Sequence, residues 1–156
     1  MNEKLSHRGP DGEGCYHDAS QGVALGNQRL AIIDVEHGQQ PFYSEDNQIV
    51  VVQNGEIFNH IELAVELRAD GYICNTHSDT EVILRLYERD GIDGVSKLNG
   101  MFAIAIYDKK NSKIYLARDS FGIKPLYYYF KANQFIFCSE IKGINEILNK
   151  IEVNNH

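Results

Sequence analysis

The sequence has few cysteines and no long apolar run. Its three cysteines, Cys15, Cys74 and Cys138, lie far apart and form no CxxC pair. Such spacing argues against a zinc site or a disulfide framework and fits a reducing compartment, so we expect a cytoplasmic protein. The longest apolar stretch, residues 101–107, is too short to cross a bilayer, and the polar N-terminus has no apolar signal core. No membrane partner is expected.

Basic residues are also scarce. Fifteen Lys and Arg stand against 22 Asp and Glu, which gives a net charge of −7, and no run of basic residues exceeds two. An acidic chain without a basic patch is a poor nucleic-acid binder, so no nucleic-acid partner is expected. The six histidines show no metal-ligand spacing such as HExxH, and the sequence contains neither a Walker A loop nor a GxSxG elbow. We therefore expect no metal site.

The chain is long enough for one domain, residues 1–156, with a substantial core. Capping boxes predict helices that start at Asn59 and Ser78 and stop near Gly71 and Gly91. Apolar residues at helical spacing predict a third helix from about residue 139.

Strands are predicted on both sides of the first two helices. Runs of β-forming residues predict them at residues 23–25, 30–33, 48–53, 101–107, 113–118, 126–130 and 134–138. Residues 1–21 are polar and rich in glycine, and we expect turns there. Helices grouped between runs of strands indicate an α+β fold.

Asn54-Gly55-Glu56 directly follows the predicted strand at residues 48–53. Asn-Gly is a strong turn dipeptide, so a turn that ends the strand is one interpretation. The other interpretation is catalytic. A glycine lets the backbone approach a ligand closely, and an Asn amide beside a backbone N–H offers two donors for an oxyanion. The residues alone do not decide between the two.

Arg29 and Asp79 are candidates for binding an amino acid. A carboxylate in a first helical turn complements the helix dipole, so a structural role alone explains Asp79, but it could instead bind a substrate ammonium group. Arg29 precedes an apolar run and is either a solvated charge at a strand end or a bidentate clamp for a carboxylate. Together, the two side chains would recognise both charged groups of an α-amino acid.

Several strings resemble the class II glutamine amidotransferase domain, and they occur in that family's order. They are HRGPDG (7–12), QRLAIID (28–34), GQQP (38–41), NGEIFNH (54–60), SDTE (78–81), LNGMFA (98–103) and RDSFGIKPLYY (118–128). Each string is weak alone, but together they are highly specific and cover roughly residues 5–143. The first, third and last look most like the asparagine synthetase B branch of the family.

This resemblance implies a fold and a reaction. The fold is that of the N-terminal-nucleophile hydrolases, an αββα four-layer sandwich of two antiparallel sheets between helical layers. In the reaction, an N-terminal cysteine thiolate, with its own α-amino group as base, attacks the side-chain amide of glutamine. Ammonia leaves, and water hydrolyses the thioester to glutamate.

The resemblance also assigns roles to residues of the matching strings. Asn54 and the Gly55 N–H would form the oxyanion hole. Arg29 would hold the glutamine carboxylate, and Asp79, with Glu56 nearby, would hold the ammonium group. The backbone of three further residues would line the pocket: Leu30, Ile32 and Ile33.

The start of the sequence departs from the family pattern. Residue 2 is Asn2, so removing Met1 exposes no thiol. In family members a few tens of residues precede the first of these strings, whereas here the string begins at His7. We therefore expect a domain truncated at its N-terminus, with the nucleophile and first strand upstream, and no glutaminase activity from this chain alone. None of the three cysteines has an evident activating neighbour, so none is expected to replace the nucleophile.

Two functions remain open. The first is the glutaminase domain of an asparagine synthase (glutamine-hydrolysing), which makes ammonia for the ATP-dependent amidation of aspartate or a similar carboxylate. Its expected partners are glutamine and a synthetase domain or subunit, with a homodimer possible. No cofactor is expected here, since ATP and Mg would bind the synthetase domain, whose pyrophosphate loop this sequence lacks. The alternative is a non-catalytic glutamine-binding or partner-docking module that has lost the nucleophile.

Overall fold

The computed structural model describes residues 1–148. Its helices are α1 (His60–Ala69), α2 (Asp79–Asp90) and α3 (Ile141–Leu148), with the 3₁₀ helices η1 (Asn2–Arg8) and η2 (Gly91–Lys97). Its strands are β1 (Gly12–Asp18), β2 (Val23–Arg29), β3 (Phe42–Tyr43), β4 (Ile49–Ile57), β5 (Gly100–Asp108), β6 (Lys113–Arg118), β7 (Tyr127–Lys131) and β8 (Gln134–Cys138). Within this part of the chain, no helix combines the length and the apolar character that crossing a membrane requires.

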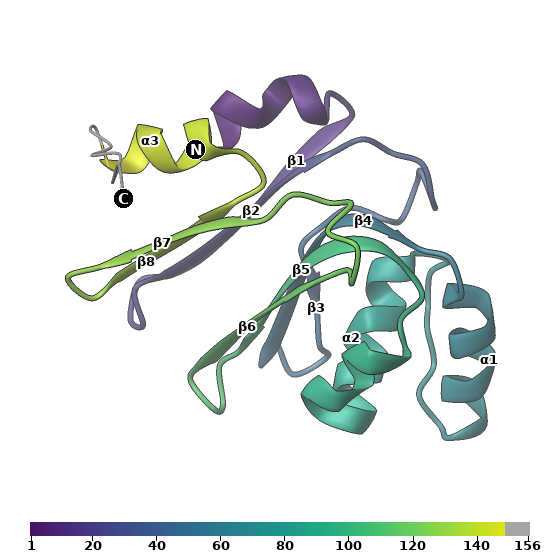
Figure 1. Cartoon of the computed structure of the whole chain (residues 1–156). Coiled ribbons are helices and arrows are strands. Elements are labelled where there is room, and N and C mark those ends of the chain that lie inside the picture. Colours follow the sequence, from purple (N-terminus) through teal and green to yellow (C-terminus); the bar gives the residue numbers. More distant parts are fainter. Residues whose placement is uncertain (149–156) are drawn as a thin grey trace.

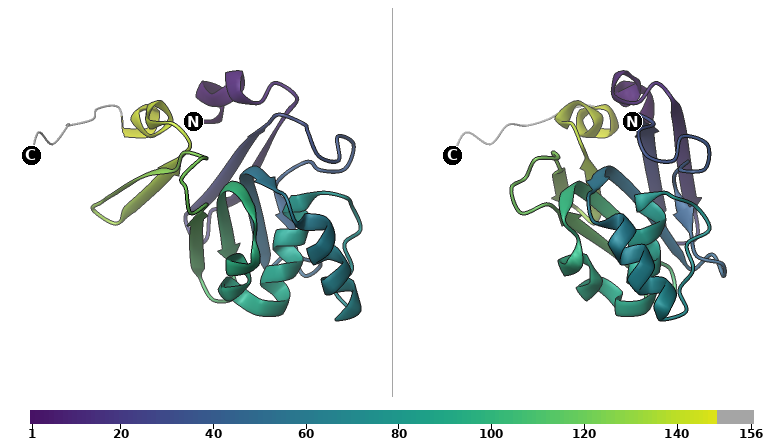
Figure 2. Two further views of the ribbon diagram at one scale, coloured as in Figure 1. Left: turned by 45° about the vertical axis from the view of Figure 1, so that its right-hand side comes forward. Right: turned by 90° about the vertical axis from the view of Figure 1, so that its right-hand side faces the viewer.

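The elements stack in four layers (Figure 1). Helices α1 and α2 cover one face of the antiparallel sheet β3-β4-β5-β6. The hairpins β1–β2 and β7–β8 lie on the other side of this sheet, and η1 and α3 lie beyond the hairpins (Figure 2). This arrangement confirms the predicted α+β fold with αββα layers.

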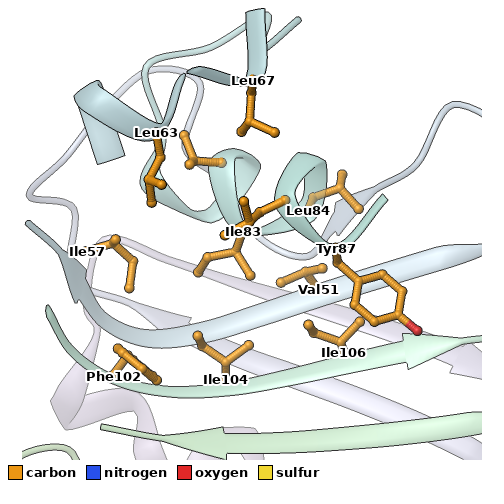
Figure 3. Packing of buried hydrophobic residues seen from close by; sticks show 12 residues of the cluster. Val51, Ile57, Leu63, Leu67, Ile83, Leu84, Tyr87, Phe102, Ile104 and Ile106 are labelled. Carbon is orange, nitrogen blue, oxygen red and sulfur yellow. The ribbon is translucent and has the colours of Figure 1, made fainter. Parts of the chain in front are cut away.

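Strands β4 and β5 form the centre of the domain. They pair antiparallel over nine residues each, with Ile49 opposite Asp108 at one end and Ile57 opposite Gly100 at the other. Alternate side chains point to opposite faces, and both faces are buried, which explains the continuous apolar runs in the sequence. The side chains toward the helices include Val51, Ile57, Phe102, Ile104 and Ile106 (Figure 3). Those toward the hairpins are Val50, Val52, Ala105 and Tyr107.

Helix α2 begins and ends where the sequence predicts. Ser78 is its N-cap, and the Ser78 hydroxyl accepts a hydrogen bond from the Thr80 N–H. Gly91 ends the helix with a φ of 64°, in the left-handed region that favours glycine. Helix α1 also follows its predicted cap, Asn59, but the Asn59 side chain bonds to backbone groups just before β5 instead of capping the helix.

Three predictions of local structure are wrong. Residues 30–33 form a loop rather than a strand, with Leu30 and Ile32 56% and 68% exposed. Strand β4 continues to Ile57, so the interpretation of Asn54 and Gly55 as a strand-ending turn also fails. Residues 12–18, predicted as turns, form β1, because every residue from 12 to 18 pairs with β2 despite the polar composition.

The second sheet differs from the prediction as well. Two antiparallel sheets are predicted, but the hairpins β1–β2 and β7–β8 are hydrogen-bonded only within themselves. Among residues 1–148, β2 and β8 therefore each have one edge without a partner strand. These two open edges border the candidate site.

Candidate functional site

A cavity of about 440 Å³ lies between β2, β4, β8 and the start of α2. The residues that the sequence predicts for a glutamine site all line this cavity: Arg29, Leu30, Ile32, Ile33, Asn54, Gly55, Glu56 and Asp79. They come from the end of β2, the loop that follows it, the second half of β4 and the first turn of α2. The fold therefore brings together side chains that are up to 50 positions apart in sequence.

Arg29 is the last residue of β2, and it is only 8% exposed. Its Nη2 donates hydrogen bonds to the carbonyl oxygens of Ile33 and Asp34, at 3.1 and 2.7 Å, and its Nη1 donates to that of Val35, at 3.0 Å. Gly38 leaves room for this arrangement, since a Cβ there would lie 2.6 Å from Arg29 Nη2. The interpretation of Arg29 as a solvated charge is therefore wrong. A guanidinium has five N–H groups, and the hydrogen bonds to these carbonyls use three of them, so Arg29 can still donate to a ligand.

Asp79 is the first residue of α2 and is 6% exposed. Its Oδ2 accepts a hydrogen bond from Gln53 Nε2 and another from the Ile57 backbone N–H, each at 2.9 Å. The side chain thus joins the helix to β4 and does not cap its own helix, a role that Ser78 fills. No hydrogen bond to Oδ1 is present among the described residues, so this oxygen is available to a cationic group.

Asn54 and Gly55 lie inside β4, opposite Ala103 and Phe102 of β5. Asn54 Nδ2 donates a hydrogen bond to Ser139 Oγ at 3.1 Å, which uses one of its two amide hydrogens. Gly55 has a φ of 148°, and a Cβ there would lie 2.0 Å from the Met101 carbonyl oxygen. A glycine is therefore required at this position, and it brings the backbone to the wall of the cavity.

Sequence reasoning missed three polar residues of the site. Gln53, 4% exposed, holds Asp79, and its own carbonyl accepts a hydrogen bond from Asn27 Nδ2 at 3.1 Å. Asn27 Oδ1 is buried without a hydrogen-bond partner in the described part of the chain. Ser139 holds the Asn54 amide. Of these three residues, the sequence marks only Gln53, as a polar residue at the end of the apolar run predicted to form the strand at residues 48–53.

The edges of β2 and β8 form two walls of the cavity. Consecutive residues line it in both strands, 24–29 in β2 and 135–138 in β8. Because side chains alternate between the faces of a strand, an unbroken series of lining residues means that the cavity borders the strand edge. Both strands run toward Asn54, since Asn27, near the end of β2, bonds to Gln53, and Ser139, directly after β8, bonds to Asn54 itself. The two open edges are thus parallel to each other.

The cysteines show no activated thiol. Burial and, to a smaller extent, the negative charge of Glu81 raise the pKa of Cys74 to about 11, so its thiolate is disfavoured at neutral pH. Cys15 is exposed and accepts a hydrogen bond from Asn2. Cys138 lines the cavity, but it is buried in a hydrophobic cluster with Ile136 and Ile144. Among residues 1–148, no group of three His, Cys, Asp or Glu side chains is placed to hold a metal ion.

Comparisons with known proteins identify the family. The model of the family described as a glutamine amidotransferase domain matches residues 1–156. Asparagine synthetase [glutamine-hydrolyzing] 1 of Bacillus subtilis (strain 168) is 49% identical over 154 residues, which are 99% of this chain and 24% of the relative. The asparagine synthetase [glutamine-hydrolyzing] of Asparagus officinalis is 44% identical, over 98% of this chain and 25% of the relative. The chain thus spans about a quarter of the length of these relatives.

A solved structure supports the fold assignment. Glutamine phosphoribosylpyrophosphate amidotransferase from B. subtilis, complexed with ADP and GMP, superposes with a TM-score of 0.66 and 28% sequence identity. The superposition covers 78% of this chain and 28% of that chain. It confirms the fold predicted from the resemblance, that of the N-terminal-nucleophile hydrolases. The chain belongs to the glutamine amidotransferase domain family and is homologous to the glutaminase part of glutamine-hydrolysing asparagine synthetases.

Proposed function

We propose that this domain binds glutamine in the cavity between β2, β4 and β8 and takes part in its hydrolysis to glutamate and ammonia. The observation that carries the proposal is the convergence of Arg29, Asn54 and Asp79 on one cavity. An N–H group that the carbonyls of residues 33–35 leave unused on Arg29 suits the α-carboxylate, and the free Oδ1 of Asp79 suits the α-ammonium group. Nothing in the described residues favours the non-catalytic alternative.

The Asn54 amide and the Gly55 N–H would stabilise the oxyanion. Attack of a thiolate on the side-chain amide carbon forms a C–S bond and places a negative charge on the amide oxygen. The second amide hydrogen of Asn54 remains free for that oxygen, because only one is used by Ser139. The C–N bond then breaks, ammonia leaves with a proton from the nucleophile's amine, and water cleaves the thioester. Loss of one such donor lowers the rate by about 10²–10³-fold.

The geometry of the two open edges supports an N-terminal nucleophile. We propose that an extended segment inserts between β2 and β8 and joins the two hairpins into one sheet. Since both edges run toward Asn54, a strand antiparallel to both would begin at the Asn54 end of the cavity. Its first residue, with a free amine and a thiol, would then stand next to the oxyanion donors.

The ammonia would serve a synthetase activity. The relatives are about four times longer than this chain and are named as asparagine synthetases, which supports a fused or separate synthetase partner. Aspartate or a similar carboxylate would be the acceptor, and ATP and Mg would bind in that partner rather than in this domain. We place the protein in the cytoplasm, in keeping with the free cysteines, and leave a homodimer as a further proposal.

Covalent labelling tests the nucleophile. The protein is produced from its gene, assayed for release of glutamate and ammonia from L-glutamine, and treated with a diazoketone analogue of glutamine. Peptide mapping by mass spectrometry then locates the adduct. We expect glutaminase activity and one adduct on an N-terminal cysteine. An adduct on Cys138, which lines the cavity, would contradict the inserted-strand proposal, and absence of both activity and adduct would contradict the proposed function.

A further inference from the structure

Gln53 is a polar side chain in the otherwise apolar centre of β4. It is 4% exposed, and it directly follows Val51 and Val52 of the hydrophobic core. A buried amide is unfavourable unless its donors and acceptors are bonded. Its position next to Asn54 raises the question of what its bonds hold in place.

The Gln53 side chain is bonded at both ends to the start of α2. Nε2 donates to Asp79 Oδ2 at 2.9 Å, and Oε1 accepts from Thr80 Oγ1 at 3.0 Å. A carboxylate accepts but cannot donate, so the amide NH₂ must face Asp79 and the amide oxygen must face Thr80. The side chain therefore has a single orientation.

The Gln53 backbone is also held by side chains. Its N–H donates to Gln40 Oε1 at 2.6 Å, and its carbonyl accepts from Asn27 Nδ2 at 3.1 Å. Strand β3 pairs with β4 only at Val51 and Val50, so amide side chains replace a partner strand at Gln53. Backbone and side chain are thus both fixed, which makes Gln53 a rigid support for Asp79.

We propose that Gln53 is a positioning residue for recognition of the substrate ammonium group. It touches Asp79 rather than the substrate, and it fixes the rotation of the carboxylate so that Oδ2 stays on β4 and Oδ1 faces the cavity. Without the Gln53 donor, only the Ile57 N–H holds Oδ2, and the carboxylate can turn away from the ligand. This inference rests on the proposed function, because it assigns the cavity to glutamine.

Comparing two substrates distinguishes a role of Gln53 in positioning Asp79 from a general role in stabilising the fold. Kinetics of the whole protein are measured with L-glutamine and with glutaramate, the monoamide of glutaric acid, which lacks the α-ammonium group. Gln53→Met keeps the side-chain length and removes both polar groups. We expect kcat/KM for L-glutamine to fall roughly 10-fold, mainly through KM, because a hydrogen bond to a charged group is lost. For glutaramate, kcat/KM should be nearly unchanged.

A second variant keeps the inference testable if Gln53→Met does not fold. Thr80→Val keeps the shape of the side chain and removes the hydroxyl that anchors Gln53 Oε1, so a smaller loss confined to L-glutamine is expected. Thermal melts verify that each variant folds. Equal losses with both substrates in folded variants would overturn the inference and leave the proposed function standing. A wild-type protein that does not hydrolyse L-glutamine would instead overturn the proposed function.

Discussion

The carboxylate of Asp79 accepts a hydrogen bond from the backbone N–H of Ile57, at 2.9 Å, which joins the first turn of α2 to the end of β4. Asn54 lies three residues earlier in the same strand. The bond therefore sets the distance between the group proposed to bind ammonium and the group proposed to bind the oxyanion. The site depends on this junction between helix and strand more than on any loop.

Replacing Asp79 with asparagine tests the ammonium site. Asp79→Asn keeps an oxygen that can accept from Ile57 and Gln53, so the fold should persist, but the negative charge is lost. We expect kcat/KM for L-glutamine to fall roughly 10- to 100-fold, as for loss of a charged hydrogen bond, and that for glutaramate to change little. Asp93→Asn, at an exposed carboxylate on η2, is the matched control and should leave both values unchanged.

Arg29→Lys tests the carboxylate clamp. A lysine keeps the charge but cannot donate to three carbonyls and a ligand in one plane. We expect KM for glutamine to rise at least about 10-fold. Hydrogen exchange of residues 30–38 should become faster, because the guanidinium holds that loop. Arg68→Lys, at an exposed arginine on α1, is the control and should change neither KM nor the exchange of this loop. An unchanged KM in Arg29→Lys would contradict the role of Arg29 as a clamp for the carboxylate.

The core between the sheet and helices α1 and α2 is the largest of the three hydrophobic clusters among the described residues. Ile106 is fully buried between β5 and α2, away from the cavity wall. Ile106→Ala should lower the free energy of unfolding by about 2–5 kcal/mol, from lost burial and the cavity left behind. Ile123→Ala, at an exposed residue, should change it by less than about 0.5 kcal/mol. Urea unfolding of both variants gives the comparison, and similar midpoints would contradict this description of the core.

The hydrogen bonds of Glu140 predict that the stability of the folded protein depends on pH. Hydrogen bonds from Arg8, then Lys142 and His7, lower its pKa to about 2 from an ordinary 4.5. The folded state thus binds the proton less readily than the unfolded state. The stabilisation is complete above about pH 4.5 and is lost as the pH falls toward 2.

Melting temperatures at pH 7, 5 and 3 measure this contribution. The wild-type protein should lose more stability between pH 5 and 3 than Glu140→Gln, in which the titrating group is absent. Glu3→Gln, at an exposed glutamate of η1, serves as the control and should follow the wild type. A Glu140→Gln variant with the wild-type pH profile would rule out this ion cluster as the cause.

Sequence patterns predicted the elements whose signals are local. The ends of α2 follow from Ser78 and Gly91, and the strands of the second half follow from apolar runs between polar turns. The apolar side chains of residues 30–33 favour a strand, and they carry no sign that the carbonyls of this loop bind Arg29. Strand β1 does not follow from its polar composition, because it is formed by pairing with β2.

The family strings predict the residues that line the cavity, but not the residues that hold these side chains in place. Arg29, Asn54 and Asp79 occur in matching strings, and all three line the cavity. Gln53 and Asn27 act through contacts between strands that are far apart in sequence, and no local pattern reports such contacts. The separation of β2 from β8 is likewise a property of the assembled sheet.

The most direct measurement is an NMR titration of the protein with L-glutamine, following the Gly55 backbone N–H and the Asn54 side-chain amide. Binding in the cavity predicts saturable shifts at both groups and at Asp79, which are much weaker with D-glutamine. Shifts on another face of the molecule, or none at about 10 mM glutamine, well above the usual range of KM, would contradict it.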